Sequence, residues 1–136
     1  IIAPCDADEM QRMMVQTVDW PHPIYIRLAK GGDPIVSRDE LGFTIGKGIV
    51  MKEPLDAVYV STGVMTQLAL KASELLHKKG ISSGVIHMPT IRPLDENLLK
   101  KYIPKVLSKI KGRKSKVIDE VENESDPSLN PTLIGF

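Results

Sequence analysis

Two short segments of this chain have the residue types and the position that phosphate chemistry could use. The tripeptide Ser61-Thr62-Gly63 follows an apolar run and precedes an amphipathic stretch. At such a place a helix N-terminus can bind an anion, but a plain tight turn accounts for the same residues, and the sequence favours the turn. The second segment, Gly46-Lys47-Gly48, lacks the further glycine and the Ser/Thr of a phosphate-binding loop. We therefore predict no phosphate loop there.

The histidines, the cysteine and the one basic run give weaker signals. His22, His77 and His87 are scattered, with no Cys, Asp or Glu at metal-ligand spacing, so the sequence predicts no zinc site. Cys5 has no histidine paired with it by a visible motif and is interpreted as a small packing residue. Residues 109–116 (KIKGRKSK) lack interleaved aromatic residues, so we predict a solvated loop between a helix and a strand.

Composition narrows the class of protein. The 136 residues are 42% hydrophobic, which suffices for one compact core or for one domain and a piece of another. Eighteen basic and seventeen acidic residues give a net charge of +1, which argues against nucleic acid and membrane partners and favours a small molecule or a protein. One cysteine, no leader and no apolar run of about 18 residues lead us to expect a cytoplasmic location.

The first part of the chain has the pattern of a strand, a helix and a second strand. The chain opens without Met on an apolar strand at residues 1–4, so we expect a fragment of a longer protein. Asp6 and Glu9 have the spacing of a capping box, which predicts a helix that ends before Trp20. Residues 24–28 form the second predicted strand. The predicted inward stripe of the helix comprises Met10, Met14 and Val18.

The second part repeats that alternation. Strands are predicted at residues 56–61, 83–88 and 116–121, with an additional edge strand within 44–51. Helices are predicted at 64–79 and 95–110; Asp95 caps the second, and Pro104 should kink or split it. The inward faces are predicted to comprise Val64, Leu68, Ala72, Leu75 and Leu76 in the first helix and Leu98, Leu99, Tyr102, Val106 and Leu107 in the second.

This order of elements predicts an α/β protein. We expect a three-layer, mostly parallel, doubly wound sheet, preceded by a βαβ remnant of another α/β domain. The predicted division places residues 1–42 in the remnant and residues 43–136 in the second domain, with an irregular tail from 122 to 136.

Several short strings, in order along the chain, resemble the transketolase family. They are IIAPCDADE (1–9), PIYIRL (23–28), FTIGKG (43–48), VSTG (60–63), TIRPLDE (90–96) and DEVE (119–122). The first two resemble the end of the family's pyrimidine-binding domain, and the others resemble its C-terminal domain. The glycine-rich turn that usually follows the acidic string in the family is absent, since the chain reads ENESDPSLNP there.

The resemblance implies an enzyme that uses thiamine diphosphate and Mg²⁺ to move a two-carbon ketol unit between sugar phosphates, as in the pentose phosphate pathway. It also implies that the cofactor, metal and catalytic residues lie upstream of Ile1, so this chain alone should be inactive. The chain would serve dimer assembly, as a homodimer or with an N-terminal transketolase section.

Arg27 is the one residue that the resemblance assigns to a site, because the matching strand end in transketolases presents an arginine to the sugar phosphate. A solvated strand-end charge or a structural ion pair would also explain Arg27. Two related enzymes share the domain: a 2-oxoacid dehydrogenase beta-type component and deoxyxylulose-phosphate synthase. The arginine of PIYIRL favours sugar-phosphate transfer over the oxoacid enzymes. A purely structural assembly module is the third alternative.

Overall fold

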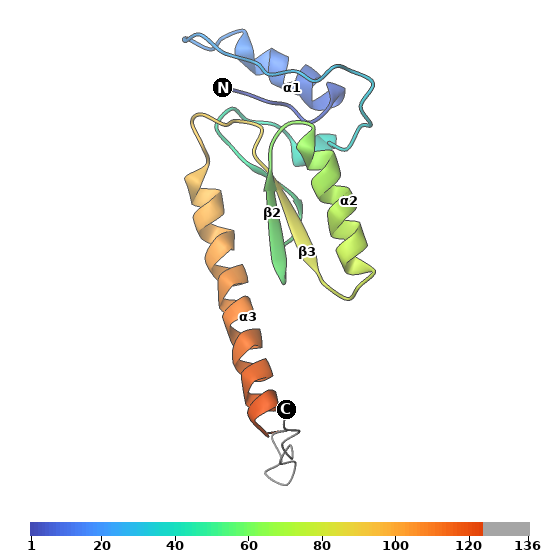
Figure 1. Cartoon of the computed structure of the whole chain (residues 1–136). Helices are drawn as coiled ribbons and strands as arrows, with labels where there is room; N and C mark the ends of the chain where they lie inside the picture. The colour runs from blue at the N-terminus through green and yellow to red at the C-terminus, as the bar shows by residue number, and fades with distance from the viewer. Residues whose placement is uncertain (124–136) are drawn as a thin grey trace, which may run out of the picture.

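The structure is layered, with a helix on either side of a small sheet. Residues 1–36, which we call the N-terminal layer, lie across one end of that sheet (Figure 1). The computed structural model describes the backbone of residues 1–123 and the side chains of residues 1–112. The strands are β1 (Ile49–Lys52), β2 (Ala57–Ser61) and β3 (Ser83–His87), and the helices are α1 (Ala7–Thr17), α2 (Met65–His77) and α3 (Glu96–Asn123). A single 3-10 turn, η1 (Asp39–Leu41), lies between α1 and β1. None of the described helices is long and apolar enough to cross a membrane.

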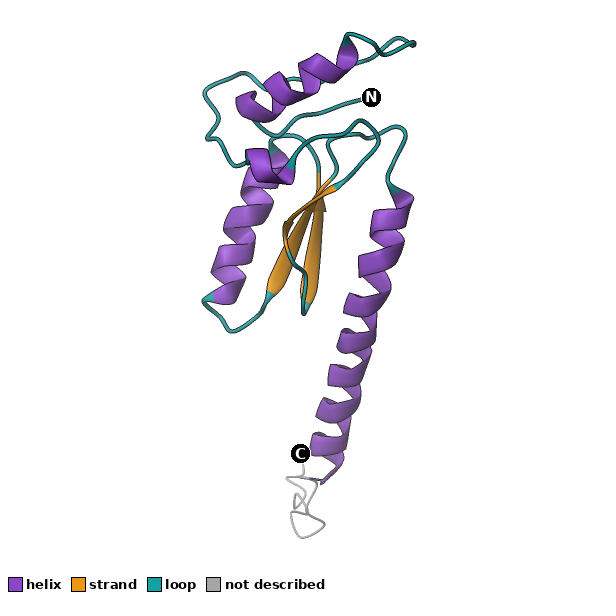
Figure 2. Ribbon diagram, turned by 180° about the vertical axis from the view of Figure 1, so that it is seen from behind, coloured by secondary structure: helices purple, strands orange, loops and turns teal. Residues whose placement is uncertain are grey.

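The sheet has the order β1-β3-β2 and is mixed (Figure 2). β2 and β3 are parallel and are joined by α2, whereas β1 runs antiparallel to β3. The α/β class with helices on both faces is confirmed, and so is the predicted edge strand. The direction of β1 follows from its short link to β2, because a parallel pair needs a longer crossover. That link passes so close to β3 that a Cβ on Gly84 would lie 2.3 Å from Pro54 Cα, so only glycine fits there.

The last predicted strand is wrong. Residues 116–121 and the whole basic run 109–116 lie inside α3, which extends to Asn123. Lysine and glutamate are good helix formers, and Gly112 alone costs a helix only about 1 kcal/mol, so nothing in this stretch stops the helix. Therefore neither the predicted loop nor the acidic strand end at 119–122 forms. The tail beyond residue 123 lies outside the described residues.

Of the two effects predicted for Pro104, the split does not occur, because α3 continues through it, and the kink stays a prediction. The proline removes one backbone donor. Tyr102 and Val106, which lie on either side of it, are buried against the rest of the protein. This packing holds both halves of the helix in place. The predicted inward side chain Leu107 is instead 51% exposed.

Two apolar clusters form the core. One belongs to the N-terminal layer and contains Ile2, Met13 and Phe43, and the other lies between the sheet and α3 and contains Ile86, Met88 and Tyr102. Phe43 follows the predicted domain boundary but packs in the N-terminal cluster. The division at residues 42 and 43 stays a prediction.

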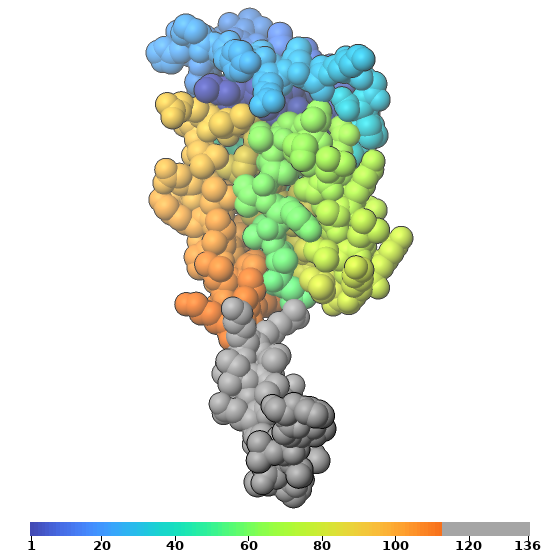
Figure 3. Space-filling view, in the orientation of Figure 1, coloured from blue at the N-terminus to red at the C-terminus, as the bar shows by residue number. Residues whose placement is uncertain are grey.

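The two strands of the predicted βαβ unit pair through a single isolated β-bridge. Ile2 forms a parallel bridge with Ile26, but also an antiparallel bridge with Thr90, which follows β3. The Ile2 amide donates to Tyr25 O at 2.9 Å, and the Ala3 amide donates to Pro89 O at 2.8 Å. The first segment of the chain therefore lies on the side of the N-terminal layer that faces the end of the sheet, and Figure 3 shows it there in dark blue.

The predicted inward faces of α1 and α2 are partly wrong. In α1 the buried side chains are Glu9 and Met13, while Met14 and Val18 are exposed. In α2, Leu68 and Leu75 are exposed, and the buried side chains are Thr66, Gln67, Ala69 and Ser73. The apolar periodicity failed because buried hydrogen bonds, rather than apolar contacts, hold these polar side chains against the sheet and the N-terminal layer.

Candidate functional site

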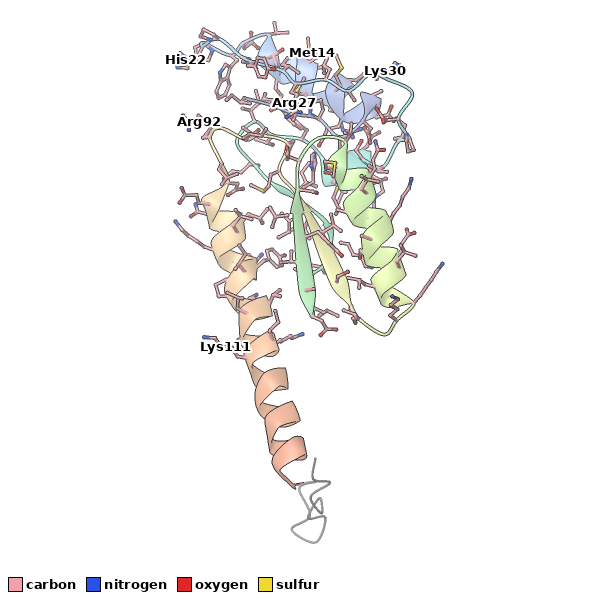
Figure 4. The ribbon with its side chains drawn as sticks, viewed as in Figure 1. Met14, His22, Arg27, Lys30, Arg92 and Lys111 are labelled. Carbon is pink, nitrogen blue, oxygen red and sulfur yellow. The ribbon has the colours of Figure 1, made fainter. Side chains whose placement is uncertain are left out.

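A cleft opens where the N-terminal layer meets the start of α2. We call it the Arg27 cleft; its volume is about 570 Å³. It is lined on one side by the segment from Arg27 to Gly31 and on the other by the turn from Thr62 to Met65. Arg27 and Lys30 both lie in the N-terminal layer, beyond the end of the sheet (Figure 4). Two cationic side chains therefore contribute to one cleft, together with one carboxylate, Asp33.

Arg27 has a fixed backbone and an exposed side chain. Its amide donates to Ile2 O at 2.8 Å, which ties the residue to the first segment of the chain. Within the described residues, the guanidinium makes no ion pair and no side-chain hydrogen bond. A guanidinium presents five donors in a rigid fork and suits the oxygens of a phosphate. This side chain is available to an anionic ligand.

The opposite wall of the cleft is the turn that begins α2. Gly63 has a φ of 56°, which lies in the left-handed region, and its amide donates to Ala3 O at 3.1 Å. The Thr62 hydroxyl donates to Met88 O at 2.7 Å. These bonds fix the turn, so Thr62 and Gly63 have structural roles, as the sequence favoured. The backbone bonds among the described residues leave the amides of Val64 and Met65 unused, and the positive end of the helix dipole points to the same side.

A second cluster of functional side chains is buried between α1, α2 and β3. We call it the Glu9–His87 network. Glu9 Oε2 accepts the Cys5 amide at 2.7 Å and lies 2.8 Å from His87 Nε2. On the other side of the ring, His87 Nδ1 lies 2.8 Å from the Thr66 hydroxyl, which in turn lies 3.0 Å from the Ser61 hydroxyl. Glu9, Thr66 and His87 are all 0% exposed.

Asp6 organises the residues around this network. As predicted, it caps α1: its Oδ1 accepts the Glu9 amide at 2.9 Å. Its carboxylate also accepts the amides of Val36 and Ser37 and the Ser37 hydroxyl. Burial favours a raised pKa for Asp6, but the hydrogen bonds from Glu9, Ser37 and Val36 outweigh burial and lower the pKa to about 2. Asp6 is therefore ionised at neutral pH, and it joins α1 to the segment that follows the second predicted strand.

Cys5 is not a nucleophile in this arrangement. Burial raises the pKa of its thiol above the usual range, and the negative charges of Glu9 and Asp6 raise it further. The side chain is 0% exposed. The environment of Cys5 therefore agrees with the packing role that the sequence indicated, as long as no cation is near it.

The remaining candidate residues lie away from both sites or have structural contacts. His22 and His77 are exposed, so the three histidines are not gathered. In the segment Gly46-Lys47-Gly48, the first amide donates to Thr90 Oγ1 and the last to Asp95 Oδ2. This segment anchors the TIRPLDE string and is no phosphate loop. Asp95 also caps α3 as predicted, since its Oδ1 accepts the Leu98 amide at 3.2 Å.

The sequence named Arg27 as a candidate, which stays a prediction, and no motif in it indicated the Glu9–His87 network. Glu9 and His87 are 78 residues apart, and no local spacing signals their contact. The one available signal was polar: Thr66 and Gln67 interrupt the apolar stripe of α2. Apolar periodicity alone gives this interruption no weight, so it assigns the inward face to other residues.

Comparison with known proteins supports a single family. Residues 46–108 match the family model of the transketolase C-terminal domain. A transketolase family protein of Sinorhizobium fredii is 43% identical over 71% of this chain and 28% of its own length. A protein of Methanocaldococcus jannaschii named as a transketolase C-terminal section is 32% identical over 74% of this chain and 33% of its own length.

Two further matches have names that state an assembly or a different reaction. A solved structure of a split-gene transketolase, an inactive beta4 tetramer, has a TM-score of 0.70 and 34% identity over 74% of this chain and 33% of that chain. A 1-deoxy-D-xylulose-5-phosphate synthase of a Synechococcus strain is 34% identical over 73% of this chain and 16% of its own length. The matched part of this chain spans no more than 33% of any of these proteins.

Proposed function

Because residues 46–108 belong to the transketolase C-terminal domain family, we propose that this chain is the C-terminal section of an enzyme that moves a two-carbon ketol unit between sugar phosphates. In this proposal the section serves assembly and carries no catalytic residue. It contributes one binding residue, Arg27, which holds the phosphate of the sugar. The cytoplasmic location stays a prediction from the sequence.

The observation that supports this proposal is the composition of the Arg27 cleft. An exposed arginine with no protein partner among the described residues shares the cleft with Lys30 and with the start of α2. All three favour a negative charge. Asp33 in the same cleft opposes them only in part. A phosphate dianion is the ligand that this balance favours, and sugar phosphates carry one.

Members of this family use thiamine diphosphate together with Mg²⁺. The thiamine diphosphate supplies the carbanion that adds to the ketose. The described residues of this chain do not fit that group. Among them, the one group of three or more His, Cys, Asp and Glu side chains that could hold a metal comprises Cys5, Glu9 and His87. It is fully buried, and two of its three ligand atoms are a sulfur and a nitrogen, whereas Mg²⁺ takes oxygen ligands. We therefore assign the cofactor to a part of the enzyme outside this chain.

We also propose that the section assembles with other chains or sections. Several large apolar side chains are exposed on the outer faces of α1 and α2: Met14, Val15, Val18, Met65, Leu68 and Leu75. Outward apolar stripes of this kind mark surfaces that another protein covers. A relative from Phocaeicola vulgatus is named as one subunit of an apulose-4-phosphate transketolase, and the solved relative is a tetramer. A second copy or an N-terminal transketolase section would cover these stripes.

The test is ketol transfer by the complete gene product that contains this chain. We expect the wild-type product to transfer the ketol unit from a phosphorylated ketose, and Arg27→Ala to raise KM for that ketose about 10- to 100-fold with little change in kcat. With an unphosphorylated ketose the two proteins should have the same KM. The matched control is Arg38→Ala, another exposed arginine, which lines a separate cleft. Equal KM values for Arg27→Ala and wild type would contradict the role of Arg27, and no transfer by the wild-type product would contradict the reaction.

A second candidate function is that of a deoxyxylulose-phosphate synthase. It is favoured by the 34% identity to such an enzyme over 73% of this chain. The same assay separates the two reactions when pyruvate and glyceraldehyde 3-phosphate replace the ketose and the aldose. Release of CO₂ from pyruvate would support the synthase and count against the transketolase.

A further inference from the structure

We propose that Cys5, Glu9 and His87 form a zinc site that joins α1 to β3. One ligand atom from each residue, namely a sulfur, a carboxylate oxygen and a ring nitrogen, lies within 4.8 Å of the other two. Cysteine, histidine and glutamate are the usual ligands of zinc, and three protein ligands leave one tetrahedral position for water. The proposal concerns a metal in this chain and does not depend on ketol transfer.

An unpaired atom points to a missing ligand. Glu9 is 0% exposed, yet its Oε1 has no hydrogen-bond partner within the described residues. A carboxylate oxygen that is buried without a partner costs free energy, and a cation held by both oxygens of Glu9 would remove that cost. Two buried carboxylates lie beside Cys5: Glu9 Oε2 accepts the Cys5 amide, and Asp6 Oδ2 lies 3.7 Å from Cys5 Sγ. A dication would balance these charges and would also stabilise the thiolate of Cys5.

The distances allow zinc to bind with small side-chain movements. Glu9 Oε2 and His87 Nε2 are 2.8 Å apart. Two such atoms on a tetrahedral zinc are roughly 3.3–3.5 Å apart, given zinc–ligand distances of about 2.0–2.3 Å. The Glu9 and His87 ligand atoms would therefore have to separate only slightly, and the Cys5 sulfur lies within 4.8 Å of both. Glu9 lies in the first turn of α1 and Cys5 directly precedes the N-cap residue Asp6, so these two ligands belong to one short segment.

The surrounding hydrogen bonds already orient the ligands. His87 Nδ1 contacts the Thr66 hydroxyl at 2.8 Å, and Gln67 Nε2 donates to Cys5 O at 2.9 Å. A histidine that binds a metal through one ring nitrogen nearly always has a partner for the other. A hydroxyl can either donate or accept, so Thr66 can accept the Nδ1 proton when Nε2 binds the metal. The network therefore suits both the metal-free and the zinc-bound states.

Cobalt binding to the purified chain is the test. Because Cys5 is the only cysteine, a thiolate-to-cobalt charge-transfer band in the near ultraviolet can arise at this site alone. We expect one equivalent of Co²⁺ to produce that band together with tetrahedral visible bands, and one equivalent of Zn²⁺ to remove both. No thiolate band when the metal is added, either to the folded chain or during refolding, would overturn the proposal.

Three variants sharpen the test. Cys5→Ser should abolish the near-ultraviolet band and weaken zinc binding about 100-fold or more, and Thr66→Val should keep the band and weaken binding about 10- to 100-fold. His77→Gln is the control; it changes an exposed histidine at the end of α2 and should alter neither quantity. If Cys5→Ser still bound one equivalent of zinc with wild-type affinity, the metal would be elsewhere and the proposal would be wrong. The wild-type spectrum decides the matter even if a variant fails to fold.

Discussion

The Arg27 cleft and the Glu9–His87 network join the same two parts of the chain in opposite ways. Both combine residues of the N-terminal layer with residues at the start of α2 or the end of β3. In the cleft the side chain of Arg27 is exposed and makes no side-chain bond to the described residues. In the network Glu9 and His87 are fully buried and bonded to each other.

This difference separates binding from stability. A charge that is exposed and unpaired contributes little to folding and is available to a ligand. A charge that is buried and paired cannot meet a large ligand, and removal of its partner destabilises the protein. We therefore expect a substitution of Arg27 to raise KM and leave the free energy of unfolding nearly unchanged. Substitutions in the network should lower the free energy of unfolding.

The largest effect should come from Glu9→Ala. It leaves His87 Nε2 and the Cys5 amide buried without an acceptor, and the free energy of unfolding should fall by about 3–5 kcal/mol. Urea denaturation followed by circular dichroism, with a chelator present, measures this loss without any contribution from bound metal. Asp8→Ala is the control, since Asp8 is the exposed neighbour of Glu9. If the two variants were equally stable, the network would not hold the layers together.

A smaller loss is expected from Thr66→Val, which keeps the size of the side chain and removes its hydroxyl. His87 Nδ1 and the Ser61 hydroxyl then lose a partner. We expect the free energy of unfolding to fall by about 1–3 kcal/mol. Thr44→Val, at an exposed position, should change it by less than about 0.5 kcal/mol. A neutral Thr66→Val would mean that the Glu9–His87 contact alone accounts for the network.

The features that could be predicted from the sequence are those whose cause is local. Asp6 and Asp95 each cap a helix by accepting the amide of the residue three positions later, so both residues of each bond are visible in one short string. The strands β2 and β3 and the helix between them were likewise visible as apolar runs and turns. Arg27 was proposed only through the family resemblance, and nothing local distinguishes it from a solvated charge.

The features that could not be predicted depend on distant contacts. The inward position of Thr66 depends on His87, which lies 21 residues away along the chain, so apolar periodicity assigned the wrong face of α2. The strand predicted at residues 116–121 failed for a related reason. Its β-branched residues are compatible with a strand, but a strand also needs a neighbour, whereas a helix makes its hydrogen bonds within itself.

The smallest stability effect should come from Arg27→Ala. In the part of the chain that the structure describes, Arg27 is bonded only through its backbone amide, which donates to Ile2 O at 2.8 Å, and alanine keeps that bond. The free energy of unfolding should therefore change by less than about 0.5 kcal/mol, while KM for a phosphorylated ketose rises. Urea denaturation of this variant beside Glu9→Ala completes the comparison. If Arg27→Ala unfolded as readily as Thr66→Val, the arginine would be a structural residue, and a rise in its KM could no longer be attributed to a lost phosphate contact.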